Sequence, residues 1–564
     1  MFAPTQQFAK SAPIPAPSGG INALDNLMSM DSNDAISQFN IVASTSGLVV
    51  RKGYREYARI FSGASVDVRT LIPFEGTTSA RDRLFACTLE GIYNVSTSGN
   101  TYTTAGEGIQ WATRSGLAGN CTYTVYTTIA EKYLVVCDEV NGLYTYTEST
   151  GVWLRVLEGV GATNVNTVGV VAGIGAPLID FVYPMVWKSR LWLIQRSTGN
   201  AYYGPIGSIY GATAYLLFSF GNKFITGGFL NTLHNFTQDG GNGPDDMLVA
   251  ISSAGDCVAY MGTDPSSIAT FNIVGVWQLG SLPAGRKGVT SPAGDLYVLC
   301  GRGVLSLSQL FKGADPGNSP SYITGKINPL VSVDISQNKT SVGWALVYHP
   351  SEGLLILTVP NTSGIYADYG QYVFDLDTRA WTRFLGVPMG CAAVWKNTLY
   401  MGCPSPASDT AALTGRVYTY QDSVDDSAST TTSPGAARAG DPINSFLITS
   451  FRPQEDGGSN TRMHFIRPQF RSIQTPLYTV DARYDFNVDD TIVVVNGILV
   501  TATAGLWGAT WGTWLWGDAA ALPVSSTLGA TGIGRYSAIS LNLRSIYKTT
   551  LIGFTGIYDT GGLL

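Results

Sequence analysis

The segment Leu84-Phe85-Ala86-Cys87, followed by Gly91-Ile92-Tyr93-Asn94-Val95, is an apolar run, a glycine turn and a second run with an aromatic residue. The same features recur in Leu134-Val135-Val136-Cys137 followed by Gly142-Leu143-Tyr144-Thr145-Tyr146. Units of this kind begin at Leu84, Leu134, Leu191, Leu248, Leu296, Leu354 and Leu399, at a spacing of about 50 residues. Strand–glycine–strand units of this period are typical of β-propeller blades. One unit cannot bury both faces of its small sheet, so neighbouring units must stack around an axis.

Two finer similarities between units support the repeat. Val186-Trp187-Lys188 with Leu191-Trp192 corresponds to Val394-Trp395-Lys396 with Leu399-Tyr400. A second pair of units shares three aromatic residues at equal offsets: Tyr144, Tyr146 and Trp153, and Tyr372, Phe374 and Trp381. Large rings at fixed offsets are suited to packing between blades, because aromatic side chains carry much of the area buried there. We therefore expect Trp153, Trp187, Trp381 and Trp395 to be structural rather than ligand-binding.

The composition indicates an all-β fold. Charged residues make up 13% of the 564 residues, glycine numbers 65, and tyrosine (29) exceeds phenylalanine (22). This profile favours short strands and tight turns over amphipathic helices. The best candidate helix is Ser32–Asn40, where a capping Ser or Asp precedes three apolar residues.

The chain length implies more than one domain. We expect residues 61–425 to form a β-propeller of six or seven blades, with long loop insertions near 155–185 and 200–245. The tract 426–445 is rich in Ser, Thr, Gly and Pro, which predicts a linker or exposed loop. Residues 1–60, an N-terminal arm and part of a platform, should pack against the β-rich platform domain 446–564, because a closed repeat brings its ends together.

Within the C-terminal region, the apolar run 491–500 and the tryptophan run 507–516 are candidates for a domain core or a subunit interface. Tryptophans interleaved with glycine could also form a sugar-binding platform, which is the less common use of such a cluster.

Charge and cysteine content exclude several kinds of site. The net charge of −6 gives no basic footprint for tight DNA binding. The seven cysteines form no CxxC pair, so we expect buried free thiols rather than zinc ligands or disulfides. Residues 1–20 lack the apolar core of a signal peptide, and the most apolar window, 168–187, is interrupted by prolines and Asp180, so we expect no membrane anchor.

The sequence offers little catalytic apparatus. The three histidines, His234, His349 and His464, have no metal-binding spacing, and neither a GxxxxGK[ST] nor a GxSxG motif occurs. The alternative to a structural protein is a carbohydrate-binding or glycoside-cleaving propeller that uses two acids near its axis. The candidate acids for it are Asp245, Asp246, Asp264 and Asp295. Acids before strands are ordinarily turn residues, so we expect no catalytic residue, cofactor or metal.

The flanks of the repeat carry a further set of motifs. The N-terminal ones are Gly19-Gly20-Ile21-Asn22-Ala23-Leu24-Asp25-Asn26-Leu27, Asp34-Ala35 and Val50-Arg51-Lys52-Gly53-Tyr54-Arg55. Later ones are Leu71-Ile72-Pro73-Phe74, Met261-Gly262-Thr263-Asp264-Pro265, Val276-Trp277-Gln278-Leu279-Gly280, Gly294-Asp295-Leu296-Tyr297, Arg467-Pro468, the Trp-Gly run 507–517 and Tyr558-Asp559-Thr560-Gly561-Gly562-Leu563-Leu564. In this order, the motifs resemble those of tail nozzle proteins of short-tailed bacteriophages, the tail tubular proteins of the B type.

The resemblance implies a structural virion protein, made in the host cytoplasm, that forms a homohexameric nozzle at the distal end of a phage tail. It implies attachment below a ring of adaptor subunits and docking of tail fibres or spikes at the periphery. Genomic DNA would pass through the lumen during ejection without sequence-specific binding. The resemblance carries no catalytic residue over to this chain.

Overall fold

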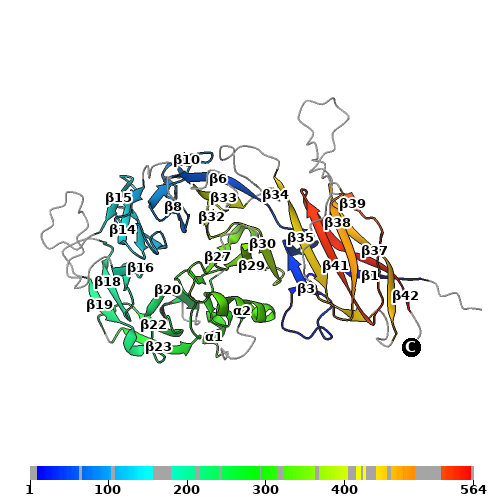
Figure 1. Cartoon of the computed structure of the whole chain (residues 1–564). Coiled ribbons are helices and arrows are strands. Elements are labelled where there is room, and N and C mark those ends of the chain that lie inside the picture. The colour runs from blue at the N-terminus through cyan, green and yellow to red at the C-terminus, as the bar shows by residue number, and fades with distance from the viewer. Residues whose placement is uncertain are drawn as a thin grey trace, which may run out of the picture.

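The structure is a computed structural model of the chain. It describes residues 9–61, 67–102, 108–156, 180–209, 215–239, 244–267, 269–292, 294–313, 322–362, 368–403, 414–420, 424–426, 440–453, 459–473, 475–489 and 522–560. The predicted runs 491–500 and 507–516 lie outside the described residues. The fold is all-β, as the composition predicted, with small sheets arranged in a ring on the left of Figure 1 and two larger sheets on the right.

The ring contains seven sheets in the described part of the chain, which makes it a seven-bladed β-propeller. The first three sheets are β7 (Thr70–Phe74), β8 (Arg83–Cys87), β9 (Gly91–Asn94) and β11 (Ile109–Gln110); β12 (Cys121–Thr127), β13 (Lys132–Asp138), β14 (Gly142–Thr147) and β15 (Val152–Arg155); and β16 (Phe181–Trp187), β17 (Arg190–Gln195), β18 (Asn200–Ile206) and β19 (Leu216–Ser219).

The next three sheets continue in chain order. They are β20 (Leu230–Asp239), β21 (Pro244–Ser252), β22 (Asp256–Gly262) and β23 (Phe271–Gln278); β24 (Val289–Thr290), β25 (Tyr297–Cys300) and β26 (Gly303–Ser306); and β27 (Ala345–His349), β28 (Leu354–Thr358), β29 (Gly370–Asp375) and β30 (Trp381–Leu385). The helices α1 (Leu307–Phe311) and α2 (Asn328–Asn338) follow the fifth sheet.

The seventh sheet closes the ring with a strand from the other end of the repeat. It consists of β31 (Cys391–Trp395), β32 (Thr398–Cys403), β33 (Thr414–Tyr420) and β6 (Tyr54–Phe61), with β10 (Thr101–Tyr102) parallel to β6. β6 pairs antiparallel with β33 and buries Ala58 and Ile60. The predicted boundary after residue 60 therefore cuts this strand, because the repeat pattern does not reveal which segment completes the last blade.

The seven leucines that define the repeat lie in the second strand of each sheet, except that Leu296 lies directly before β25. All seven are buried. Each pair of neighbouring sheets shares its own hydrophobic cluster, and the cluster between the seventh and first sheets completes the circle. Each sequence repeat therefore corresponds to one sheet and to one buried interface with the next sheet.

The similarities between units have a structural basis. Trp187 and Trp395 each end the first strand of a sheet, before tight turns in which Lys188 and Lys396 adopt positive φ. In each turn the lysine ammonium lies over the preceding tryptophan ring, at 5.2 and 4.6 Å from the centroid. Trp153 and Trp381 pair across strands with Tyr146 and Phe374.

The four tryptophans are all buried, which confirms that they are structural. The Trp187 ring reaches the next sheet, where it contacts Phe271 at a centroid distance of 5.7 Å. The Trp153 ring contacts Phe85 of the preceding sheet at 5.0 Å. These contacts are the packing between blades that the equal offsets predicted.

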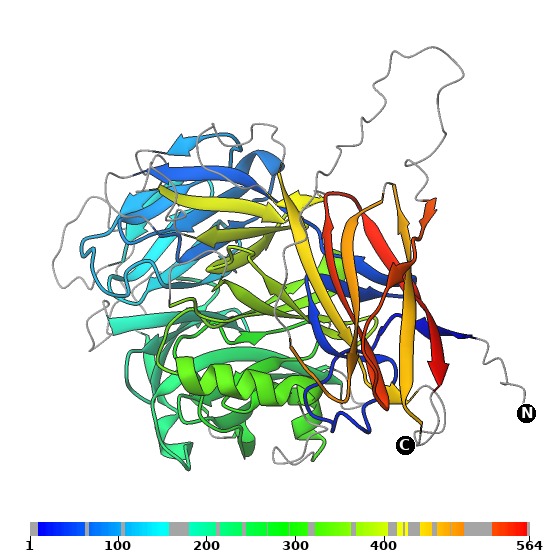
Figure 2. The ribbon, with the colours of Figure 1, turned by 45° about the vertical axis from the view of Figure 1, so that its right-hand side comes forward.

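Both ends of the chain together form a β-sandwich beside the ring (Figure 2). One sheet holds β1 (Lys10–Pro15), β4 (Ile41–Ser44), β5 (Gly47–Val50), β37 (Thr461–Ser472), β39 (Leu522–Val524), β40 (Leu528–Gly529) and β42 (Thr549–Thr560). The other holds β2 (Gly20–Ile21), β3 (Asp34–Phe39), β34 (Asp425–Asp426), β35 (Asp441–Thr449), β36 (Arg452–Pro453), β38 (Leu477–Tyr484) and β41 (Tyr536–Ser545). One hydrophobic cluster fills the space between them.

The sandwich and the ring share one continuous sheet. β30, the last strand of the sixth sheet, pairs with β2 at Gly20 and Trp381 and with β3 at Phe39 and Arg383. Gly20 has a φ of 77°, and a Cβ on it would lie 2.6 Å from the backbone nitrogen and oxygen of Trp381. Only glycine lets the two backbones approach so closely.

Three local predictions were wrong. Ser32–Asn40 contains strand β3 rather than a helix, because Ala35 and Phe39 are buried in the sandwich and tertiary packing overrides a weak local pattern. The region 200–245 is not a loop insertion, since it contains β18, β19 and β20. The linker 426–445 overlaps β35, which begins at Asp441 and buries Ile443.

Replacing Gly20 by Ala should disrupt the joint between ring and sandwich. We expect Gly20→Ala to lower the free energy of unfolding by about 1–3 kcal/mol, because the new methyl group overlaps the Trp381 backbone. Gly313→Ala is the matched control, since Gly313 also has a positive φ but a Cβ on it would have no atom within 4 Å. If urea denaturation gave equal losses of unfolding free energy for the two variants, the positive φ alone, and not the contact with Trp381, would account for the destabilisation.

Truncation of a buried tryptophan should be costly. We expect Trp187→Ala to lower the free energy of unfolding by about 3–5 kcal/mol, because the cavity lies between two sheets. Ile129→Ala, at a fully exposed position, should change it by less than about 0.5 kcal/mol. A small loss for Trp187→Ala in denaturant titrations would contradict its place in the packing between blades.

Candidate binding site at the axis of the ring

A cavity of about 1100 Å³ lies at the axis of the ring. The first strand of every sheet contributes to its wall, namely β7, β12, β16, β20, β24, β27 and β31. Glu139 and Arg196 come from connections between second and third strands. In an antiparallel sheet these connections lie at the same end as the start of the first strand, so the cavity opens toward one end of the blades.

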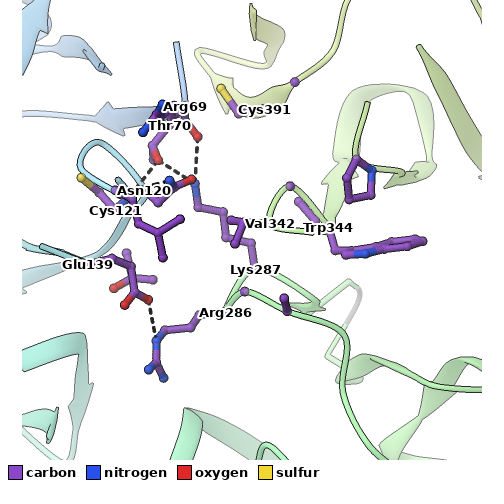
Figure 3. Close-up of a pocket in the computed structure, with 18 of the residues that line it drawn as sticks. Arg69, Thr70, Asn120, Cys121, Glu139, Arg286, Lys287, Val342, Trp344 and Cys391 are labelled. Atoms are coloured by element: carbon purple, nitrogen blue, oxygen red, sulfur yellow. Dashed lines mark hydrogen bonds and ion pairs between the residues drawn. The ribbon is translucent and has the colours of Figure 1, made fainter. Parts of the chain in front are cut away.

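Lys287 extends from the segment before β24 toward the first sheet (Figure 3). Its ammonium donates to Thr70 Oγ1 at 2.6 Å and to the Arg69 carbonyl oxygen at 3.1 Å. Its own carbonyl accepts from the Leu346 N–H at 2.9 Å, in a parallel pairing with Ala345. Lys287 is therefore fixed both at its backbone and at its ammonium group, and its side chain links the fifth sheet to the first.

Arg286 links two other sheets of the ring. Its Nε donates to the Glu139 carboxylate at 2.7 Å, in the second sheet (Figure 3). One terminal nitrogen donates to the Asn231 carbonyl oxygen at 2.5 Å, in the fourth sheet. The guanidinium also lies 5.8 Å from the centroid of the Phe229 ring. A buried arginine with a carboxylate and a carbonyl as partners is a strong fixed contact.

Arg69 holds the segment that leads into the second sheet. One terminal nitrogen donates to the carbonyl oxygens of Gly116 and Ala118, at 2.7 and 2.9 Å. Its Nε lies 3.7 Å from the Asp67 carboxylate. Burial raises the pKa of Asp67, and the charge of Arg69 opposes this rise. Both residues line the cavity.

Two residues beside the cavity, the partly buried His234 and the buried Cys391, carry no charge near neutral pH. Burial lowers the pKa of His234 to about 4, and the Tyr183 hydroxyl lies 3.4 Å from its Nε2 atom. Burial raises the pKa of Cys391 to about 12. All seven cysteines are buried free thiols, as the spacing predicted.

The acids proposed from the sequence lie elsewhere. Asp246 accepts a hydrogen bond from Thr237, Asp264 from the Ser266 backbone and hydroxyl, and Asp295 from Leu296, Ser306 and Ser308. Asp245 lies in β21, and its side chain is outside the described part of the structure. None of the three described side chains lines the cavity. Asp264 and Asp295 make the bonds of turn and capping residues, and Asp246 bonds its cross-strand neighbour Thr237.

The acids that do line the cavity are Asp67 and Glu139. Sequence reasoning missed them, because the repeat was aligned on the second strand of each unit. Extending the alignment to the first strands would have drawn attention to Arg69, Arg286 and Lys287, which precede β7 and β24.

Histidine chemistry has little support in the described residues. His349 is buried and its pKa is lowered mainly by burial, while His464 lies 2.7 Å from the Asp559 carboxylate. Across the described ranges, no three His, Cys, Asp or Glu side chains gather as metal ligands would. Among those same residues, no helix has the length and apolarity to cross a membrane.

No family model and no curated protein matches this chain. Among solved structures, the extracellular domain of a hybrid two-component system from B. thetaiotaomicron has a TM-score of 0.37 and 9% identity. That similarity covers 69% of this chain and 46% of the other, so this chain spans less than half the length of that neighbour. An exo-β-1,3-galactanase from Phanerochaete chrysosporium has a TM-score of 0.24 and 9% identity, over 79% of this chain and 98% of that one.

The burial of His234 predicts a pH dependence of stability. Its pKa is about 4 in the folded chain and near 6.5 when unfolded, so the unfolded state binds more protons between these values. Stability should therefore fall as pH falls from 6.5 to 4. We expect the melting temperature of His234→Gln to fall less steeply over this range in thermal unfolding. Parallel curves of melting temperature against pH for the two proteins would contradict the lowered pKa of His234.

Proposed function

We propose that this chain is a subunit of a homohexameric tail nozzle of a short-tailed bacteriophage. In this proposal the nozzle attaches below the adaptor ring, docks tail fibres or spikes, and lets the genome pass. The observation that carries the proposal is that the N-terminal motifs of the resemblance coincide with the joint between sandwich and ring. We assign no catalytic role to the chain.

The first motif, Gly19–Leu27, forms part of the joint. Asn22 is buried, and its amide nitrogen donates to Asp25 at 2.8 Å and to Asp34 at 2.7 Å. Asp34, from the second motif, accepts a hydrogen bond from the Lys326 ammonium at 2.7 Å. One polar network therefore joins the two motifs, which gives their residue types a structural reason.

The third motif, Val50–Arg55, connects the sandwich to β6. The buried Arg51 guanidinium makes two bonds to Asp426, at 2.8 and 2.6 Å, and one to Asn40 at 2.9 Å. Burial alone would lower the pKa of Arg51, but the charge and hydrogen bonds of Asp426, together with smaller contributions from Tyr420 and Tyr54, more than offset burial and the pKa is raised. Arg55 is paired with Asp425 beside it. These pairs fix the strand that closes the ring against the sandwich.

Such a joint suits a subunit of a large ring. A cyclic assembly requires different surfaces of one subunit to meet around an axis, and a fixed angle between its parts keeps the ring closed. In our proposal the sandwich is the ring-forming platform and the propeller stands outward.

The outer face of β37 and β42 is our candidate for the contact between subunits. Phe465 and Ile552 are each 47% exposed there, which is unusual for large apolar side chains. β37 also has exposed Arg462, Arg467 and Arg471 at this face. A lumen that must release DNA should not present a row of arginines to its phosphates, so we place this face between subunits rather than in the lumen.

The proposal is tested on the full chain by negative-stain microscopy and mass photometry. We expect six-fold rings with a mass six times that of the 60.0 kDa chain. Phe465→Asp should shift the population to smaller species, because a charge would be buried at the contact. Ile129→Asp, at a fully exposed position in the ring of small sheets, should leave the rings intact.

A different oligomeric state would contradict the proposal. A full-length protein that stays monomeric over a wide concentration range would argue against the nozzle. If that monomer also released reducing sugar from a glycan, the glycoside-cleaving alternative would replace it.

A further inference from the structure

The charge of the axial cavity is opposite in sign to that of the chain. Four basic residues line it, Arg69, Arg196, Arg286 and Lys287, against two acids, Asp67 and Glu139. The chain as a whole has a net charge of −6. Clefts with low-dielectric walls concentrate the field of the charges that line them. An anion therefore meets a locally favourable potential in a molecule that otherwise repels it.

The two acids do not cancel this charge. The Glu139 carboxylate forms an ion pair with Arg286 Nε at 2.7 Å, and the Asp67 carboxylate lies 3.7 Å from Arg69 Nε. Lys287 donates only to neutral oxygens, those of Thr70 and the Arg69 backbone, and has no carboxylate partner among the described residues. An ammonium has three N–H groups, so one of them is left for a ligand.

The cationic groups are already held in place. Lys287 is fixed by two acceptors, and the Arg69 guanidinium by the carbonyl oxygens of Gly116 and Ala118. A guanidinium carries five N–H donors, and these two bonds leave others available. Side chains that are ordered before binding lose little conformational entropy when a ligand arrives.

The remaining lining suits a ligand with hydroxyl groups and a ring. Tyr123 is 37% exposed on the first strand of the second sheet, and Asn120 precedes that strand. The Tyr183 hydroxyl lies on the adjacent sheet. A volume of about 1100 Å³ exceeds what a lone inorganic ion would need and lies slightly above the usual range of small-molecule sites.

We propose that the axial cavity binds a small organic anion with carboxylate and hydroxyl groups, the chemistry of an acidic sugar, with its carboxylate at Lys287 and Arg69. The aromatic and amide groups of Tyr123 and Asn120 would contact the sugar ring. The site lies within one chain, so it goes beyond the nozzle proposal and does not depend on it.

The test compares a trisaccharide of galacturonic acid with its methyl ester, which keeps the sugar rings and their hydroxyl groups but lacks the charge. Isothermal titration of the full chain should show the acid binding at least about tenfold more tightly than the ester. Equal affinities, or no binding of the acid, would overturn the proposal. Sodium sulfate is the third probe, and sulfate binding as tightly as the acid would overturn the assignment of a sugar.

Variants locate the carboxylate. Lys287→Gln should weaken binding of the acid about tenfold or more, and Lys287→Arg should retain most of it. Lys312→Gln, after α1 and away from the cavity lining, is the matched control and should bind as the unaltered chain does. Unchanged affinity in a folded Lys287→Gln would overturn the assignment. If that variant does not fold, the comparison of acid with ester decides alone.

Discussion

The pairing of β6 with β33 is the interaction on which the rest of the structure depends. It joins the two ends of the repeat, so the seventh sheet packs against the first and every sheet has two neighbours. It also fixes where the chain leaves the ring, which sets the sandwich beside the sixth and seventh sheets. A cavity at the axis exists only because this circle is closed, since each of the seven sheets supplies part of its wall.

Much of the ring could be predicted from the sequence, because the same pattern of buried residues occurs in all seven units. The leucines beginning at Leu84 mark buried second strands, and Trp153 and Trp381 occupy equivalent places in two sheets. Elements that occur once were harder to predict. β3 has the local pattern of a helix, and only its burial in the sandwich makes it a strand. The short helix α2 was missed, although Pro329 near its start is a usual signal.

The cavity was less predictable than the fold for a physical reason. Its residues come from seven sheets, and no local pattern relates Lys287 to Thr70 or Arg286 to Glu139. Conversely, Asp264 and Asp295 looked like site residues because they precede strands or turns, where the backbone itself needs acceptors. An acidic residue can accept hydrogen bonds from its own turn or pair with a residue distant in the sequence. Only the folded ring shows which of the two interactions a given carboxylate makes.

The sandwich also constrains how the chain can be synthesised. β1 pairs with β42 from Lys10 with Tyr558 to Pro15 with Gly553, so a strand that precedes the ring in the chain has its partner in a segment translated after the ring. Pairings of such sequence separation form slowly, and unpaired apolar strands favour aggregation in the meantime. The two sandwich sheets that contain β1 to β5 therefore remain incomplete while the whole ring is being synthesised. The sandwich can therefore be completed only after β42 has been translated, and a chaperone that shields extended segments would protect β1 to β5 until then.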